Sequence, residues 1–179
     1  MRIVAGRFGG RRLTAPPGRD TRPTSDRVRE ALFSILGPLD GAVALDLFAG
    51  TGALGLEALS RGAERVDFVE RDRRALTVLR ANLDALGIDA DTGRVVSGDA
   101  RRHLRDAATR GATYDLVLID PPYRDGDRLG PALDADLRPL LRPGARVVTE
   151  SDRRRPLPLG LAVEDERRYG DTLIRIHRA

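Results

Sequence analysis

A short segment, Asp120-Pro121-Pro122-Tyr123, follows a continuous apolar run in the sequence. Proline cannot donate a hydrogen bond to a β-ladder, and each proline favours an extended conformation for the residue before it. We therefore expect a stiff loop that offers the Asp120 carboxylate and the Pro121 carbonyl as acceptors. Two acceptors suit a group with two N–H bonds, such as the exocyclic amine of a base or an amide. Tyr123 adds a flat face on which a planar group can stack.

A glycine-rich segment lies earlier in the chain, between a predicted strand and a predicted helix. Gly50, Gly52 and Gly55 match the G-x-G-x-x-G pattern of nucleotide-binding turns. Glu70 follows about 20 residues after Gly50, at the end of the next predicted strand, where an acid can bind both ribose hydroxyls. This combination predicts a site for a cofactor that contains a nucleoside.

Both NAD and S-adenosylmethionine fit this pattern. Asp46 precedes the glycine loop, where its charge would repel a pyrophosphate but suit the cationic end of a methionine group. Asp99 follows a third predicted strand and is placed to accept a hydrogen bond from an adenine amine. The chain also leaves no residues for the second domain that a dehydrogenase normally needs. These observations favour S-adenosylmethionine, and an NAD-linked reductase is the alternative.

The basic residues of this chain are all arginines, and their distribution is uneven. The formal net charge is +4, and arginines crowd the first thirty residues while acids are scarce in the first half of that stretch. Arginine presents planar forks that suit phosphates. We therefore predict that this cluster contacts a polyanion. The candidate residues are Arg7, Arg11, Arg12, Arg22, Arg27 and Arg29.

Several classes of protein are disfavoured by composition. The chain has no cysteine and only two histidines, so a thiolate zinc site, a histidine-rich metal site or a catalytic triad is not expected. It shows neither an apolar signal region at its start nor a run long enough to span a bilayer. We expect a cytoplasmic protein without a resident metal and without a membrane partner.

The elements that must position these residues alternate along the chain. Strands are expected over residues 42–47, 65–70, 94–97, 114–119 and 145–150, and helices over 53–61, 72–86, 100–110 and 128–141. A closing hairpin is expected over 163–168 and 173–177. This alternation predicts an α/β fold with a mostly parallel, Rossmann-like sheet, helices on both faces and a C-terminal antiparallel hairpin.

The N-terminal region precedes this repeat. Residues 1–22 are expected to form a basic arm or hairpin, with short strands over 2–5 and 11–14, and residues 23–179 the main domain. A first helix is predicted with Thr24 or Ser25 as its N-cap and Asp26 in its first turn, and its apolar stripe leaves Arg27 and Arg29 facing water or a ligand. The stripe consists of Val28, Ala31, Leu32, Ile35 and Leu36. We expect removal of the arm to leave the fold and the cofactor affinity largely intact.

The combined motifs resemble the class I, Rossmann-like methyltransferases, and more narrowly the RsmD family of bacterial 16S rRNA guanine-N2 methyltransferases. The resemblance covers nearly the whole chain. Its distinctive parts are residues 22–30 (RPTSDRVRE), residues 45–63 (LDLFAGTGALGLEALSRGA) and Asp120 to Tyr123. It implies methylation of a guanine amine in the 16S rRNA of the small ribosomal subunit or of its assembly particle. We also expect the protein to be a monomer.

The resemblance also implies roles for individual residues. Asp120, Pro121, Pro122 and Tyr123 would hold the target base. The residues implied to bind S-adenosylmethionine, and its product S-adenosylhomocysteine, are Asp46, Phe48, Gly50, Gly52, Glu70, Arg71, Asp99 and Ala100. Two alternatives stay open: an adenine-N6 methyltransferase of DNA or RNA, and a catalytically silent RNA-binding protein with this fold.

Overall fold

The structure is a computed structural model, and it describes residues 1–15, 26–122 and 126–179. Within these residues the chain forms one seven-stranded sheet of order β3-β2-β1-β4-β5-β7-β6. The strands are β1 (Val43–Leu47), β2 (Arg65–Glu70), β3 (Gly93–Ser97), β4 (Tyr114–Ile119), β5 (Leu141–Asp152), β6 (Ala162–Tyr169) and β7 (Thr172–Arg178). Strands β1 to β5 pair in parallel, whereas β7 pairs antiparallel with β5 and with β6. The predicted α/β fold class is confirmed.

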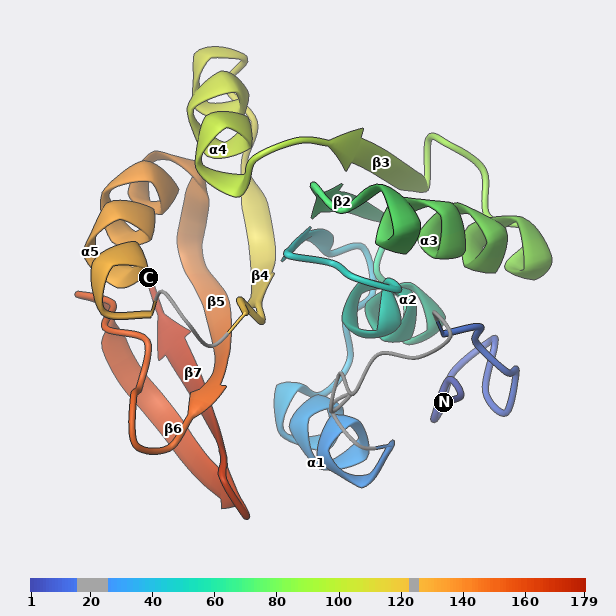
Figure 1. Ribbon diagram of the computed structural model, residues 1–179, viewed down its shortest axis with the longest axis horizontal. Helices are drawn as coiled ribbons and strands as arrows, with labels where there is room; N and C mark the ends of the chain where they lie inside the picture. Colours follow the sequence, from blue (N-terminus) through green and yellow to red (C-terminus); the bar gives the residue numbers. More distant parts are fainter. Residues whose placement is uncertain (16–25, 123–125) are drawn as a thin grey trace.

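Helices cover both faces of the sheet (Figure 1). They are α1 (Asp26–Leu36), α2 (Ala53–Ser60), α3 (Arg73–Leu86), α4 (Ala100–Thr109) and α5 (Gly126–Leu137), which a 3₁₀ turn, η1 (Arg138–Leu140), continues. Helices α1, α2 and α3 pack on one face and share one buried apolar cluster. Helices α4 and α5 pack on the other face over a second cluster. Of the described helices, none has the length and apolar character needed to cross a membrane.

The parallel strands bring the predicted site residues to one edge. Leu47 pairs with Val69 of β2 and with Ile119 of β4, and Ile119 pairs with Thr149 of β5. The residue that follows each of these four therefore lies at the carboxyl edge of the sheet, where ligands bind in open α/β folds. Those residues are Phe48, Glu70, Asp120 and Glu150.

Two sequence-based expectations for α1 are wrong. Ile35 was assigned to the apolar stripe, but its side chain is exposed. Arg29 was expected to face water or a ligand, but it is among the largest fully buried side chains, at 0% exposure. Its guanidinium donates to the carbonyl oxygen of Arg2 and to Asp26 Oδ1, the latter at 2.8 Å. The buried face of α1 is therefore rotated toward the arm, and Phe33 occupies it beside Arg29.

The N-terminal arm, residues 1–15, packs against α2 and α3. Its predicted strands are reduced to one antiparallel bridge between Arg2 and Arg12. Ile3 and Leu13 are buried in the same apolar cluster as α1 to α3. The backbone N–H groups of Val4 and Ala5 donate to the buried Glu57 carboxylate of α2, at 2.7 and 3.1 Å. These contacts speak against an arm that can be removed without cost to the fold.

Candidate active site

The glycine loop joins β1 to α2 and has a backbone that favours glycine. Gly50 and Gly52 have φ angles of 56° and 83°, in the left-handed region that side chains rarely adopt. A Cβ at Gly52 would lie 2.4 Å from Leu79 Cδ1, so a larger residue would also force the Leu79 side chain to move. A Cβ at Gly50 would meet only the Phe48 carbonyl oxygen, at 3.9 Å. The loop is therefore packed tightly at Gly52 and leaves open space at Gly50.

Phe48 enters this loop with a φ of 63°, the only positive φ of a non-glycine residue in the described chain. A left-handed conformation costs about 1–2 kcal/mol for such a residue, and strain of this kind gathers at functional sites. The half-buried side chain packs against the apolar cluster under α4 and α5. Phe48 thereby turns the chain from β1 toward the space at Gly50.

Glu70 connects the glycine loop to the start of α3. Its Oε2 accepts a hydrogen bond from Gly50 N at 2.8 Å, and its Oε1 accepts from Arg71 N and Asp72 N at 2.7 and 2.8 Å. The carboxylate is thus fixed at the carboxyl edge of β2, next to the loop that the sequence assigned to the cofactor. The Arg71 side chain is exposed beside it.

Asp46 lies below the loop and is 2% exposed. Its Oδ2 accepts a hydrogen bond from Gly55 N, at 2.9 Å, in the first turn of α2. Burial raises the pKa of Asp46 to about 7, opposed by the Gly55 hydrogen bond and reinforced by the charge of Glu70. A cation placed at this edge would favour the ionised form of Asp46.

Asp99 is the N-cap of α4, and its Oδ1 accepts from Arg102 N at 3.0 Å. Gly98 N donates to the carbonyl oxygen of Glu70 at 2.9 Å, which places the predicted adenine-binding segment next to the predicted ribose-binding residue. The Asp99 side chain is exposed, and the Ala100 side chain that follows is buried. The predicted cofactor residues therefore lie along one edge, from β1 across β2 to β3.

Asp120 follows β4 at the same edge and is half-buried. Burial raises its pKa well above the ordinary value for aspartate, and the charges of Glu150 and Asp46 raise it further. Pro121 is buried and Pro122 is exposed. Tyr123, the predicted stacking residue, lies outside the described residues.

Sequence reasoning missed Glu150 as part of this site. Glu150 is 3% exposed and follows Thr149, whose partner on β4 is Ile119. It therefore lies across from Asp120 on the neighbouring strand, and its charge acts on that carboxyl group. The sequence could have indicated Glu150, because it is an acidic residue at the carboxyl end of a predicted apolar strand. Glu70 and Asp120 were predicted from the same position on their strands.

The predicted RNA-binding arginines differ in their exposure to solvent. Arg7, Arg11, Arg12 and Arg27 are exposed. The Arg7 guanidinium lies 4.5 Å from the centre of the Phe8 ring, and Arg11 Nη2 donates to the carbonyl oxygen of Ala85 at 2.6 Å. Arg29 is buried, as described above, so its side chain is not part of this surface. Arg22 lies outside the described residues.

Two segments therefore meet at one edge of the sheet. The glycine loop at Gly50 suits a cofactor that contains a nucleoside, and the segment at Asp120 offers acceptors to a group that carries N–H bonds. Among the described residues, no group of three or more histidine, aspartate or glutamate side chains is arranged to hold a metal ion. Two open hollows, of about 360 and 310 Å³, lie away from this edge, one beside the C-terminus and one beside the start of β1. Neither includes a predicted site residue, so the strand ends define the candidate site.

Comparison with known proteins agrees with this geometry. The sequence model of the family described as "Conserved hypothetical protein 95" matches residues 1–178. YlbH of Bacillus subtilis is 38% identical over 182 residues, which cover 99% of this chain and 98% of YlbH. Ribosomal RNA small subunit methyltransferase D of Escherichia coli is 45% identical over 127 residues, or 70% of this chain and 62% of the relative.

A solved structure of the Escherichia coli methyltransferase yhhF superimposes with a TM-score of 0.84 at 37% identity. The match covers 99% of this chain and 97% of that one. The likeness thus extends over the arm, the glycine loop and the closing hairpin together. The chain belongs to the family of conserved hypothetical protein 95, the RsmD family.

Proposed function

We propose that this protein is an S-adenosylmethionine-dependent methyltransferase that acts on the exocyclic N2 amine of a guanine in 16S rRNA. One observation carries the proposal. The Asp120-Pro121-Pro122 segment ends β4 at the same edge as the glycine loop and Glu70. Names of relatives that specify methylation of small-subunit rRNA support the substrate class.

The residues present fit S-adenosylmethionine. Open space at Gly50 lets a ligand approach the backbone, and the Glu70 carboxylate beside it can accept from a ribose hydroxyl. Asp46 supplies negative charge below the loop, and Asp99 flanks Glu70 on the side of β3. When bound, the cofactor supplies a methyl group on a positively charged sulfur.

The target amine would be held at Asp120. The amine lone pair is delocalised into the base, so acceptors that favour the pyramidal nitrogen make it a better nucleophile. The Asp120 carboxylate and the Pro121 carbonyl are such acceptors. Transfer forms a nitrogen–carbon bond, breaks the sulfur–carbon bond and requires the nitrogen to lose one proton. The raised pKa of Asp120 makes its carboxylate a stronger base than an ordinary aspartate, which suits it to accept that proton.

The basic arm would place the RNA. Exposed Arg7, Arg11 and Arg12 can neutralise backbone phosphates, which fixes position but carries no sequence information. The target base would then be drawn out of its stack toward Asp120. We propose that the protein acts as a monomer in the cytoplasm, on 16S rRNA or on a small-subunit assembly particle.

The test is transfer of a labelled methyl group to small-subunit rRNA taken from a strain that lacks the protein. Nucleosides from the product are separated and identified by mass spectrometry. We expect labelled N2-methylguanosine with the wild-type protein, formed about 100-fold more slowly by Asp120→Ala. Labelled N6-methyladenosine would overturn the guanine assignment in favour of an adenine methyltransferase. RNA binding without transfer to naked RNA or to assembled particles would favour a catalytically silent RNA-binding protein.

A further inference from the structure

The arginines of the described surface fall into two sets that differ in their acidic neighbours. Every arginine of α4, β6 and β7 has a carboxylate oxygen within 4 Å. These pairs include Arg102–Asp106 at 3.7 Å, Arg105–Asp136 at 3.3 Å and Arg178–Glu164 at 2.7 Å. In contrast, the three arginines of α3 have no such partner in the described part of the chain. The α3 arginines therefore form no ion pair in the described part of the chain, although Asp72 caps the helix and Asp84 follows Arg80 by about one turn.

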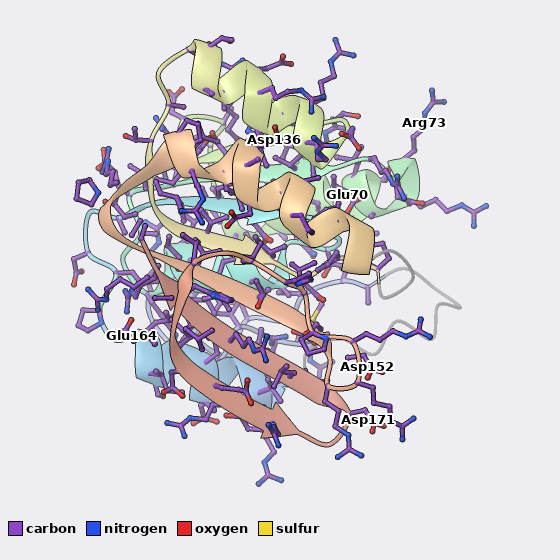
Figure 2. The ribbon with its side chains drawn as sticks, turned by 90° about the vertical axis from the view of Figure 1, so that its left-hand side faces the viewer. Glu70, Arg73, Asp136, Asp152, Glu164 and Asp171 are labelled. Carbon is purple, nitrogen blue, oxygen red and sulfur yellow. The ribbon has the colours of Figure 1, made fainter. Side chains whose placement is uncertain are left out.

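The three arginines of α3 point away from the sheet. The buried face of this helix consists of Ala75, Leu76, Leu79, Asn82, Leu83 and Leu86. Arg73, Arg74 and Arg80 are exposed on the other side. Arg73 and Arg80 are seven residues apart, so they lie on one side of the helix, separated by about 10.5 Å along its axis. Figure 2 shows Arg73 extending from the surface, on the same side of the molecule as Glu70.

Arginines at the start of α3 do not stabilise the helix. Arg73 and Arg74 occupy the first turn, where the helix macrodipole disfavours cations, and the carboxylate of the N-cap Asp72 accepts from the backbone N–H groups of Arg74 and Ala75 at 2.9 Å. Arg101 and Arg102 take the equivalent place in α4, but Asp136 and Asp106 lie beside them. The backbone of this turn is thus capped by Asp72, whereas the exposed guanidinium groups of Arg73 and Arg74 remain within reach of an anionic ligand.

The arm continues this positive surface along α3. Arg11 Nη2 donates to the carbonyl oxygen of Ala85, near the end of the helix, and Thr14 N donates to Asn82 Oδ1 at 2.8 Å. The arm is therefore held against α3 by hydrogen bonds at two positions. From Arg73 to Ala85 the helix rises by about 18 Å. Arg73, Arg74, Arg80 and Arg11 line this length, and we call them the α3 track.

We infer that the α3 track is an RNA-binding surface that holds backbone phosphates of the substrate. The inference rests on the proposed function, and it adds the three arginines of α3 to Arg11, which the proposed function already assigns to RNA binding. Guanidinium forks match phosphate oxygens, and each arginine that neutralises a phosphate releases counterions condensed on the RNA. An arginine that forms no ion pair can do so without first leaving an acidic partner. The track begins at the edge of the sheet that carries Glu70, so RNA held there is anchored beside the cofactor site.

The test compares two double variants with equal changes of charge. Arg73→Gln/Arg80→Gln removes two arginines of α3 that form no ion pair. Arg102→Gln/Arg105→Gln removes two arginines of α4 that are paired with Asp106 and Asp136. Affinity for transcribed 16S rRNA is measured over a range of salt concentrations. We expect the α3 variant to lower the slope of log affinity against log salt by about two, because each lost phosphate contact lowers it by about one. We expect the α4 variant to keep the wild-type slope.

Controls separate this inference from the proposed function. Calorimetric titration with S-adenosylhomocysteine and thermal melting should match the wild type in both variants. Arg73→Lys/Arg80→Lys keeps the charges and should keep most of the slope. Equal slopes for the wild type and the α3 variant, or equal losses in the α3 and α4 variants, would overturn the α3 track. Failure of the wild type to bind or methylate rRNA would instead overturn the proposed function.

Discussion

Replacing Glu57 with alanine tests whether the arm is part of the folded core. The side chain lies on α2 and is fully buried. Its carboxylate accepts hydrogen bonds from Val4 N and Ala5 N and from Arg61 Nε, the last at 2.7 Å. Alanine would leave two backbone N–H groups of the arm and one guanidinium without this acceptor.

The expected cost follows from these contacts. A buried hydrogen-bonding group that loses its partner costs about 1–3 kcal/mol. Breaking a buried ion pair by removing one partner costs about 3–5 kcal/mol. The Arg61 side chain is 16% exposed and can reach water, which places the loss near the lower end of that range. We expect the free energy of unfolding to fall by about 3 kcal/mol, a large part of the 5–15 kcal/mol typical of a domain.

The measurement is urea denaturation of the wild type, Glu57→Ala and Glu57→Gln, together with hydrogen exchange of the Val4 and Ala5 amides. Glutamine keeps one carbonyl oxygen, so Glu57→Gln should lose less stability than Glu57→Ala and protect at least one amide. A loss below about 1 kcal/mol for Glu57→Ala, with unchanged exchange at both amides, would refute the reasoning. By the same contacts, a chain lacking residues 1–19 should melt early.

The remaining predictions concern the cofactor and the transfer step. Glu70→Ala should weaken S-adenosylmethionine by about 10- to 100-fold, because a hydrogen bond to a charged group contributes about 1.5–3 kcal/mol; unchanged affinity by calorimetry would remove Glu70 from the site. Asp120→Ala should lower methyl transfer at saturating substrates by about 100-fold with little effect on cofactor affinity, and wild-type turnover would disprove its role. Since the pKa of Asp46 is about 7 and a cation favours its ionised form, affinity for S-adenosylmethionine should rise about tenfold from pH 6 to pH 8. Asp46→Asn should remove most of that rise, and an equal rise in the variant would assign it to another group.

The edge of the sheet that carries the site was predictable from the sequence, because each helix cap, glycine turn and strand end depends on residues close together in the chain. Asp72 caps α3 and Gly87 ends it in the left-handed conformation, which agrees with the helix predicted over residues 72–86. The Pro121-Pro122 pair follows β4, which ends at Ile119, because proline has no backbone N–H to donate to a neighbouring strand. Once strand ends and glycine turns are placed, a parallel sheet brings Asp46, Glu70 and Asp120 together without further information.

The contacts that sequence reasoning missed join distant segments. Glu57 has partners more than fifty residues away in the arm, so nothing near it in the chain distinguishes it from a surface acid. Arg29 is buried because Asp26 and the Arg2 carbonyl accept hydrogen bonds from its guanidinium group. A prediction based on the spacing of apolar residues takes no account of such polar partners. Glu150 joins the site through its register with β4. Polar groups buried by tertiary partners leave no periodic signal in one sequence.

The hydrogen bonds of Glu70 also limit how it can recognise a sugar. A carboxylate offers about four lone pairs, two on each oxygen. Oε1 already receives Arg71 N and Asp72 N, and Oε2 receives Gly50 N. One lone pair on Oε2 is left to accept from a ligand while the three backbone bonds persist. Glu70 can therefore bind a single ribose hydroxyl, so removing one of the two hydroxyls from the cofactor should abolish the contact and removing the other should spare it.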